Sequence, residues 1–177
     1  MGLEDFVKEE GVGIVLIDMQ PAFVNQLSNP KKLIRRQMDF MDTYHIPIIG
    51  LELRPRVNDV TIKPLKEKIQ RSGGRIFLKE ENDGFTSEAF KDALVRRKLS
   101  KLILMGCNTS YCVLSTAKSA VKFGYEIAVS LDFVSEPRFY KKDFPSKIVE
   151  SLDWYKQNSK VFLDEPPKKR CFDSFFR

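Results

Sequence analysis

Three residues with reactive or charged side chains, Asp18, Lys79 and Cys112, each follow or end an apolar run of strand length. A cysteine attacks a carbonyl carbon only as the thiolate, and a free thiol is mostly protonated near pH 7, so it needs a base or a cation beside it. Asp18 is able to take the proton, and Lys79 to hold the resulting negative charge. If the fold brings them together, the three residues predict a cysteine hydrolase.

The surroundings of Cys112 support a cysteine hydrolase. Each of the three residues can also be explained by a structural role alone. The segment NTSYCVL predicts a helix start, where free N–H groups and the helix dipole favour a thiolate and a nearby oxyanion. On the other hand, cysteines are commonly core residues, and Cys107 and Cys171 are assigned to the core or the surface. Asp18 is equally suited to cap a turn, and Lys79 to join a surface charge cluster.

Six apolar runs alternate with helix-length amphipathic segments and predict how these residues are positioned. The runs are 13–18, 47–53, 75–79, 101–106, 126–132 and 160–163, and the helical segments are 30–44, 60–72, 86–99, 108–124 and 143–157. Strands rich in Val, Ile and Leu without polar alternation are typical of a buried parallel sheet. The pattern predicts one α/β domain over residues 1–163, a three-layer α/β/α doubly wound sheet of about six mainly parallel strands. Ligands bind such sheets at the carboxyl ends of the strands, where the strand order reverses.

Composition argues against two other classes of protein. The net charge is +6, but Lys and Arg are scattered over the predicted helices, which favours solvated surfaces over a nucleic-acid site. No stretch approaches the ~18 apolar residues of a membrane span, and MGLEDFVKEE is polar, so we expect a cytoplasmic protein with reduced thiols. Residues 164–177 form a basic, aromatic tail that resembles a nuclear localisation cluster. Its phenylalanines are candidates for docking on a neighbouring subunit.

Three segments resemble the signature blocks of the isochorismatase-like cysteine hydrolases. They are VLIDMQPAF, a strand ending at Lys79 with Phe85 six residues later, and GCNTSYCVLSTAKSAVKFGYEIAVSLD. The last block is specific, because Gly, Thr, Cys-Val, Ala and Gly-Tyr stand at matching distances. The resemblance runs in order from about Gly13 to Asp132.

This resemblance implies the roles of the central residues. Cys112 would be the nucleophile, Asp18 the general base and Lys79 the electrostatic partner, acting on a small amide, carbamoyl or ureido C–N bond through a thioester. It further implies a cis peptide at Cys107–Asn108, which would direct N–H groups near Asn108 and Cys112 at the oxyanion. It also implies a homodimer or homotetramer.

The sequence departs from the nicotinamidases of this family at their metal site. Where those enzymes carry Asp-x-His, this chain reads Glu52 and Arg54, and its single histidine, His45, precedes the strand. We therefore predict neither a catalytic metal nor a cofactor, and nicotinamide is disfavoured as a substrate. Glu52 is expected either to bind a substrate nitrogen or to pair with Arg54 or Arg56.

Four aromatic or acidic residues are candidates for the substrate pocket: Phe23, Glu52, Phe85 and Tyr111. For both phenylalanines the alternative is ordinary core packing, and for Tyr111 it is a subunit interface. A rival function is a catalytically silent member of the family that serves as a binding or scaffold protein. The intact set of Asp18, Lys79 and Cys112 argues against that rival.

Overall fold

Six parallel strands form a single sheet in the order β3-β2-β1-β4-β5-β6. The strands are β1 (Val12–Ile17), β2 (Ile48–Leu53), β3 (Ile76–Lys79), β4 (Lys101–Cys107), β5 (Glu126–Ser135) and β6 (Val161–Leu163). The computed structural model describes residues 1–54 and 59–163. The expectations for Arg56, Cys171 and the tail at 164–177 fall outside these residues.

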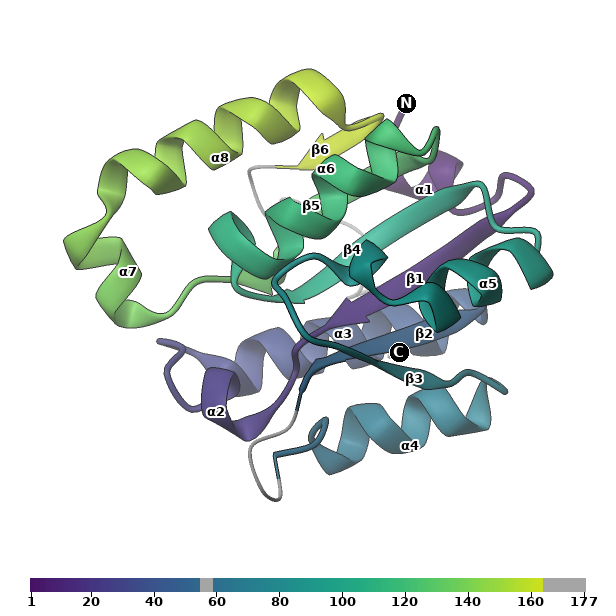
Figure 1. Cartoon of the computed structure of the whole chain (residues 1–177), viewed down its shortest axis with the longest axis horizontal. Helices are drawn as coiled ribbons and strands as arrows, with labels where there is room; N and C mark the ends of the chain where they lie inside the picture. Colours follow the sequence, from purple (N-terminus) through teal and green to yellow (C-terminus); the bar gives the residue numbers. More distant parts are fainter. Residues whose placement is uncertain (55–58, 164–177) are drawn as a thin grey trace, which may run out of the picture.

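Apart from α1, which precedes β1, the helices lie between the strands along the chain (Figure 1). They are α1 (Leu3–Phe6), α2 (Pro21–Val24), α3 (Pro30–Tyr44), α4 (Lys63–Arg71), α5 (Glu88–Arg96), α6 (Leu114–Lys122), α7 (Arg138–Asp143) and α8 (Pro145–Asn158). A 3-10 turn, η1 (Gly84–Thr86), and a π-helical turn, η2 (Thr109–Val113), precede α5 and α6. No helix that the structure describes has both the length and the apolar character that a membrane span requires.

Local sequence explains where the longer helices begin and end. Helix α3 starts at Pro30, which needs no N–H bond there, and the Asn29 side chain accepts a hydrogen bond from the Lys32 N–H at 3.2 Å. The helix ends at Tyr44, and its C-cap, His45, has a left-handed φ of 35°. Helix α8 likewise begins at a proline, Pro145.

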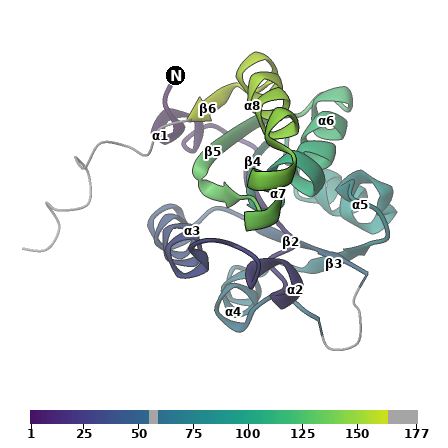
Figure 2. The same cartoon turned by 90° about the vertical axis from the view of Figure 1, so that its left-hand side faces the viewer.

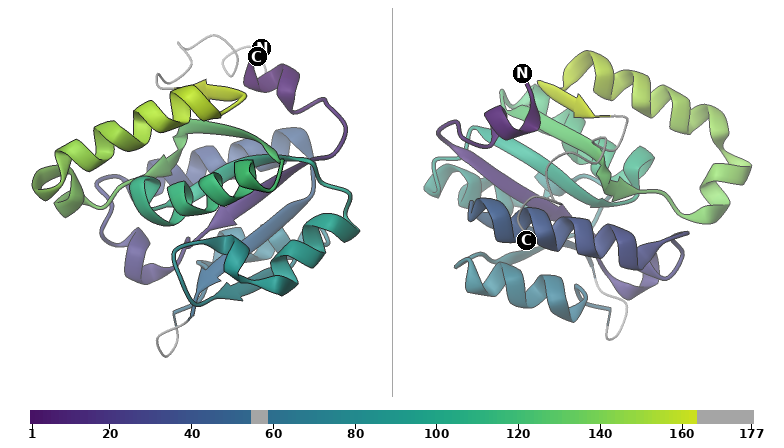
Figure 3. Two further views of the ribbon diagram at one scale, coloured as in Figure 1. Left: turned by 45° about the horizontal axis from the view of Figure 1, so that its top comes forward. Right: turned by 180° about the vertical axis from the view of Figure 1, so that it is seen from behind.

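Two apolar cores, one on each face of the sheet, hold the layers together. Helices α3 and α4 cover one face, seen in front in the right-hand view of Figure 3, and α5, α6 and α8 cover the other (Figure 2). Alternate residues of β1 divide between the cores: Ile14 and Leu16 face α3, whereas Val15 and Ile17 face α5 and α6. The predicted doubly wound α/β sheet is confirmed.

The strand order reverses between β1 and β4. From β1 the chain adds β2 and β3 on one side, then crosses to add β4, β5 and β6 on the other. The carboxyl ends of β1 and β4 are therefore neighbours at the reversal, which is where ligands bind in sheets of this kind. Asp18 follows β1 directly, and η2, which contains Cys112, follows β4.

Candidate active site

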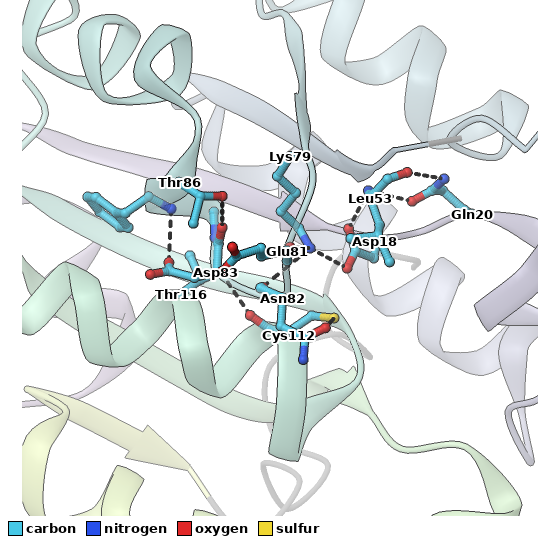
Figure 4. Close-up of polar contacts among 12 residues, drawn as sticks. Asp18, Gln20, Leu53, Lys79, Glu81, Asn82, Asp83, Thr86, Cys112 and Thr116 are labelled. Carbon is cyan, nitrogen blue, oxygen red and sulfur yellow. Dashed lines mark hydrogen bonds and ion pairs between the residues drawn. The ribbon is translucent and has the colours of Figure 1, made fainter. Parts of the chain in front are cut away.

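The structure brings Asp18 and Lys79 into a buried ion pair. The Lys79 Nζ lies 2.8 Å from the Asp18 Oδ2, and both side chains are 0% exposed. The second carboxylate oxygen, Oδ1, accepts a hydrogen bond from the Leu53 N–H at 3.0 Å. Figure 4 shows the ammonium group between this carboxylate and the loop that follows β3. Both oxygens of Asp18 are thus held in a fixed orientation.

The backbone at Asp18 turns sharply as it leaves the sheet. Its φ is 51°, in the left-handed region, while its N–H still donates to the Leu51 carbonyl at 2.9 Å. Aspartate is among the few residues other than glycine that occupy this region with some frequency. The turn places the carboxylate at the strand-order reversal.

The loop after β3 encloses Lys79. Its ammonium group also donates to the carbonyls of Glu81 at 3.1 Å and Asn82 at 3.3 Å, so all three of its protons have an acceptor. The Asn82 side chain in turn accepts a hydrogen bond from the Cys112 thiol, with 3.5 Å between Sγ and Oδ1. Asn82 therefore connects the cation to the thiol.

Thr116 joins the same loop to helix α6. Its hydroxyl donates to the Cys112 carbonyl at 2.8 Å and accepts from the Gly84 N–H at 2.9 Å. One turn further on, the Ser119 hydroxyl bonds to Asp83. These contacts fix the position of Cys112 relative to β3.

The thiol and the carboxylate lie close enough to shift each other's pKa. Cys112 is 2% exposed, and burial, together with the charge of Asp18, raises the pKa of its thiol to about 12 in spite of the opposing effect of Lys79. Burial also raises the pKa of Asp18, against the lowering effect of Lys79. Burial therefore works against the thiolate that a helix start favours. A thiol in this environment needs a base in order to react.

The chain reaches Cys112 through Gly106 and not through a cis peptide. No peptide bond is cis in the part of the chain that the structure describes, so the expected cis bond at Cys107–Asn108 is wrong. Gly106 has a φ of 137°, and a Cβ there would lie 2.0 Å from the Ile17 carbonyl oxygen. Only glycine fits this close approach to β1, and it supplies the change of direction before η2.

A cavity of about 270 Å³ adjoins these residues. Its lining comes from the segments after β1, β2, β4 and β5: Gln20, Ala22, Phe23, Gln26, Leu53, Arg54, Asp59, Asn108, Pro137 and Phe139. Leu53 binds Asp18 through its N–H, and the side chain of Asn108 interacts with Cys112, so both border the cavity and the three central residues. The Gln20 amide donates hydrogen bonds to the carbonyls of two other lining residues, Leu53 and Asp59.

Of the three aromatic residues predicted for the substrate pocket, one lines the cavity and two do not. Phe23 lines the cavity. Phe85 does not: its ring packs against Phe90 and Phe123, with centroids 5.3 and 5.2 Å apart, so the core alternative is correct. Tyr111 lies beneath the Lys147 ammonium, 3.8 Å from the ring centroid, outside the residues that line the cavity.

The structure gives Glu52 a partner that the sequence did not predict. The buried Glu52 carboxylate accepts a hydrogen bond from the Thr61 N–H at 2.7 Å, which fastens the chain before α4. Arg54 pairs at the surface with Glu80 at 3.0 Å, so the proposed pair with Glu52 is not formed. His45 lies at the end of α3, ahead of β2 and at the opposite edge of the sheet. Within residues 1–54 and 59–163, no group of three or more His, Cys, Asp or Glu residues is placed to hold a metal ion.

Three residues that contact Cys112 or the turn around it were not predicted from the sequence. Thr116 stands four residues after Cys112, the spacing at which a helical threonine reaches a carbonyl, so that signal was present. Asn82 follows Lys79 by three residues, but its contact with the thiol depends on the path of the loop. Glu136, just after β5, binds Ser110 in η2 from a distant part of the chain.

Comparison with known proteins agrees with this geometry. The sequence profile described as "Isochorismatase domain" matches residues 12–143. No curated protein matches the chain. The chain therefore belongs to the isochorismatase family, and it is a hydrolase of that family.

Solved structures share the fold at low sequence identity. The nicotinamidase SaPncA from Staphylococcus aureus is 17% identical with a TM-score of 0.71, the match covering 89% of this chain and 99% of that one. The MAR1 ribonuclease from Caenorhabditis elegans is 22% identical with a TM-score of 0.70, covering 86% and 76%. YcaC from Escherichia coli, described as an octameric hydrolase of unknown specificity, is 18% identical with a TM-score of 0.73, covering 86% and 74%.

Proposed function

We propose that the protein is an amidohydrolase that cleaves a small amide, carbamoyl or ureido C–N bond through a thioester on Cys112. The observation that carries the proposal is the buried Asp18–Lys79 ion pair, held at 2.8 Å beside the protonated thiol. Removing two charges from water is costly, and apolar residues of similar volume would often be as stable. A base and a cation kept at this cost beside a thiol are suited to nucleophilic catalysis.

The reaction begins when Asp18 takes the thiol proton and the sulfur attacks the carbonyl carbon. The carbonyl electron pair moves to oxygen, where N–H groups near Asn108 and Cys112 stabilise the charge. As the intermediate collapses, the C–N bond breaks, and the protonated Asp18 gives its proton to the leaving nitrogen. Amine or ammonia departs and leaves an acyl group on sulfur.

The second half of the reaction returns the enzyme to its resting state. Asp18, again ionised, takes a proton from water as the water oxygen attacks the thioester carbon. The C–S bond then breaks, and the sulfur regains a proton from Asp18. The sum is amide plus water giving acid plus amine. The Lys79 ammonium holds Asp18 in place and stabilises its carboxylate before each half of the reaction begins.

The cavity supports a small substrate. Its volume of about 270 Å³ lies just below the range of roughly 300–1,000 Å³ typical of drug-sized ligands. Phe23 and Phe139 provide apolar walls, and Gln20, Asp59 and Asn108 provide polar ones. Gln20 and Asp59 are already hydrogen-bonded to the protein, so we expect them to shape the cavity.

The test is intact-protein mass spectrometry after incubation with small amides, ureas and carbamoyl amino acids, quenched in acid to preserve a thioester. We expect an acyl adduct on the wild type and on Cys107→Ala, and none on Cys112→Ala. Cys107 is the matched control, because it is also a buried free thiol on the same strand-to-turn segment. No adduct on any variant, together with alkylation of Cys112 that Asp18→Asn does not slow, would favour the silent scaffold.

We further propose a homo-oligomer in the cytoplasm that does not bind nucleic acid. The octameric description of YcaC supports assembly, and a catalytic thiol suits a reducing compartment. Mass in solution by light scattering and imaging of the tagged full-length chain test the first two points. A mobility shift with RNA at low salt, lost at higher salt, would contradict the third.

A further inference from the structure

Two of the residues before Cys112 are held by α8. The Tyr155 hydroxyl, fully buried, donates to the Thr109 carbonyl at 2.8 Å. The Lys147 ammonium stands over the Tyr111 ring at 3.8 Å. The outer side of the turn is therefore in contact with a helix that lies some forty residues later in the chain.

Ser110, between them, is held by a buried carboxylate. Both its backbone N–H and its hydroxyl donate to Oε1 of Glu136, which follows the last residue of β5. Glu136 is 4% exposed, and its Oε2 has no hydrogen-bond partner among the residues that the structure describes. A buried carboxylate with one unpaired oxygen destabilises the fold. Its presence here therefore indicates a role other than stability.

The charged and titratable groups around Glu136 only partly offset its burial. Lys141 of α7 and Lys147 of α8 lower the pKa of Glu136, as do the bonds from Ser110, yet burial leaves that pKa raised. The charge of Glu136 also raises the pKa of Cys107 and of Tyr155. Glu136 contacts η2 through Ser110, so its effect on Cys112 runs through geometry.

We propose that Glu136 is a positioning residue: by holding Ser110 it fixes the nucleophile turn so that the Cys112 thiol faces Asp18. Ser110 stands two residues before Cys112 in η2, and the Tyr111 and Val113 N–H groups already donate to the Asn108 carbonyl. Glu136 therefore supplies the anchor from outside the turn. This inference rests on the proposed role of Cys112 as the nucleophile activated by Asp18.

The experiment measures the rate constant for alkylation of Cys112 by acrylamide at pH 7.5, in a Cys171→Ser background, by peptide mass spectrometry. Glu136→Leu removes the acceptor oxygens at similar size, and we expect the rate to fall about tenfold, because small displacements of reacting groups have effects of this order. Glu136→Gln keeps an acceptor oxygen and is expected to restore the rate to within threefold of the parent.

Two internal controls separate positioning from a general loss of structure. Cys107 is fully buried, so a loosened fold would expose it and speed labelling of both thiols, whereas lost positioning slows Cys112 and leaves Cys107 unlabelled. Glu126→Leu removes an exposed carboxylate from the first residue of β5 and should leave both rates unchanged.

The outcomes are distinct. The positioning role of Glu136 is overturned if Glu136→Leu is alkylated at the parental rate, or if both thiols are labelled faster. The proposed function still stands in that case if Asp18→Asn slows the alkylation of Cys112. If Asp18→Asn does not slow Cys112 in the parent, activation of the thiol fails, and both proposals are overturned.

Discussion

Replacing Lys79 with methionine tests the buried ion pair directly. The change keeps an unbranched side chain of similar shape but removes the ammonium, which bonds to Asp18 at 2.8 Å and to the Glu81 and Asn82 carbonyls at 3.1 and 3.3 Å. Removing one partner of a buried pair typically costs about 3–5 kcal/mol, and each kcal/mol lowers Tm by about 2–4 °C in a chain of this size. We therefore expect a Tm about 6–20 °C below that of the wild type.

The pH dependence of this effect has a definite sign. Burial raises the pKa of Asp18, so the stability that its proton contributes is fully present below the ordinary aspartate pKa and is lost as the pH rises through the raised value. Without Lys79 that pKa rises further and the ionised form is less stable. The destabilisation by Lys79→Met should therefore be larger at pH 7 than at pH 4.

The assay is thermal and urea unfolding of the two single variants, Lys79→Met and Asp18→Asn, and of the double variant. The double variant should be more stable than the sum of the single changes predicts, with a coupling of at least about 1.5 kcal/mol, because it leaves no unpaired charge. A loss below about 1 kcal/mol in Lys79→Met, or additivity across the cycle, would refute the reasoning.

Three other predictions concern the turn, the thiol and the cavity. Gly106→Ala should lower the free energy of unfolding in urea by about 3 kcal/mol or more, and a loss below 1 kcal/mol would count against the close approach to β1. In Asp18→Asn, alkylation of Cys112 should rise about tenfold per pH unit until the pH reaches the pKa of the thiol, because without the base only the free thiolate reacts. The wild-type profile should be less steep, and coincident profiles would contradict the role of the base. Phe85→Ala should lower the free energy of unfolding by about 3–5 kcal/mol and leave KM unchanged. Phe23→Ala should raise KM with little effect on stability, and the reverse pattern would exchange the roles of the two residues.

The order and type of the main elements could be predicted from the sequence. All six strands and the five longer helices occur where apolar runs and helical spacing predicted them, with α3 at the predicted bounds of 30–44. Buried parallel strands are apolar on both faces, and amphipathic helices repeat their apolar residues every three or four positions, so both leave a local signal. The short helices α1, α2 and α7 span too few residues to show such a period.

The convergence of Asp18, Lys79 and Cys112 also followed from the sequence, because the ends of parallel strands lie at one edge of the sheet whatever the side chains do. Other properties depend on atoms brought in from far along the chain. The pKa of Cys112 is set by how completely its environment excludes water, which three layers decide together.

The same holds for the orientation of Phe85 and the contact between Glu136 and Ser110. The Phe85 ring turns into a core formed by α5 and α6, and Glu136 reaches the turn because β5 extends to Ser135, further than its apolar run indicates. The sequence by itself determined which strands meet and which reactive residues end them, since those are local patterns. Only the tertiary structure decided which side chains touch, and how deeply, because contact and desolvation are properties of the packed chain.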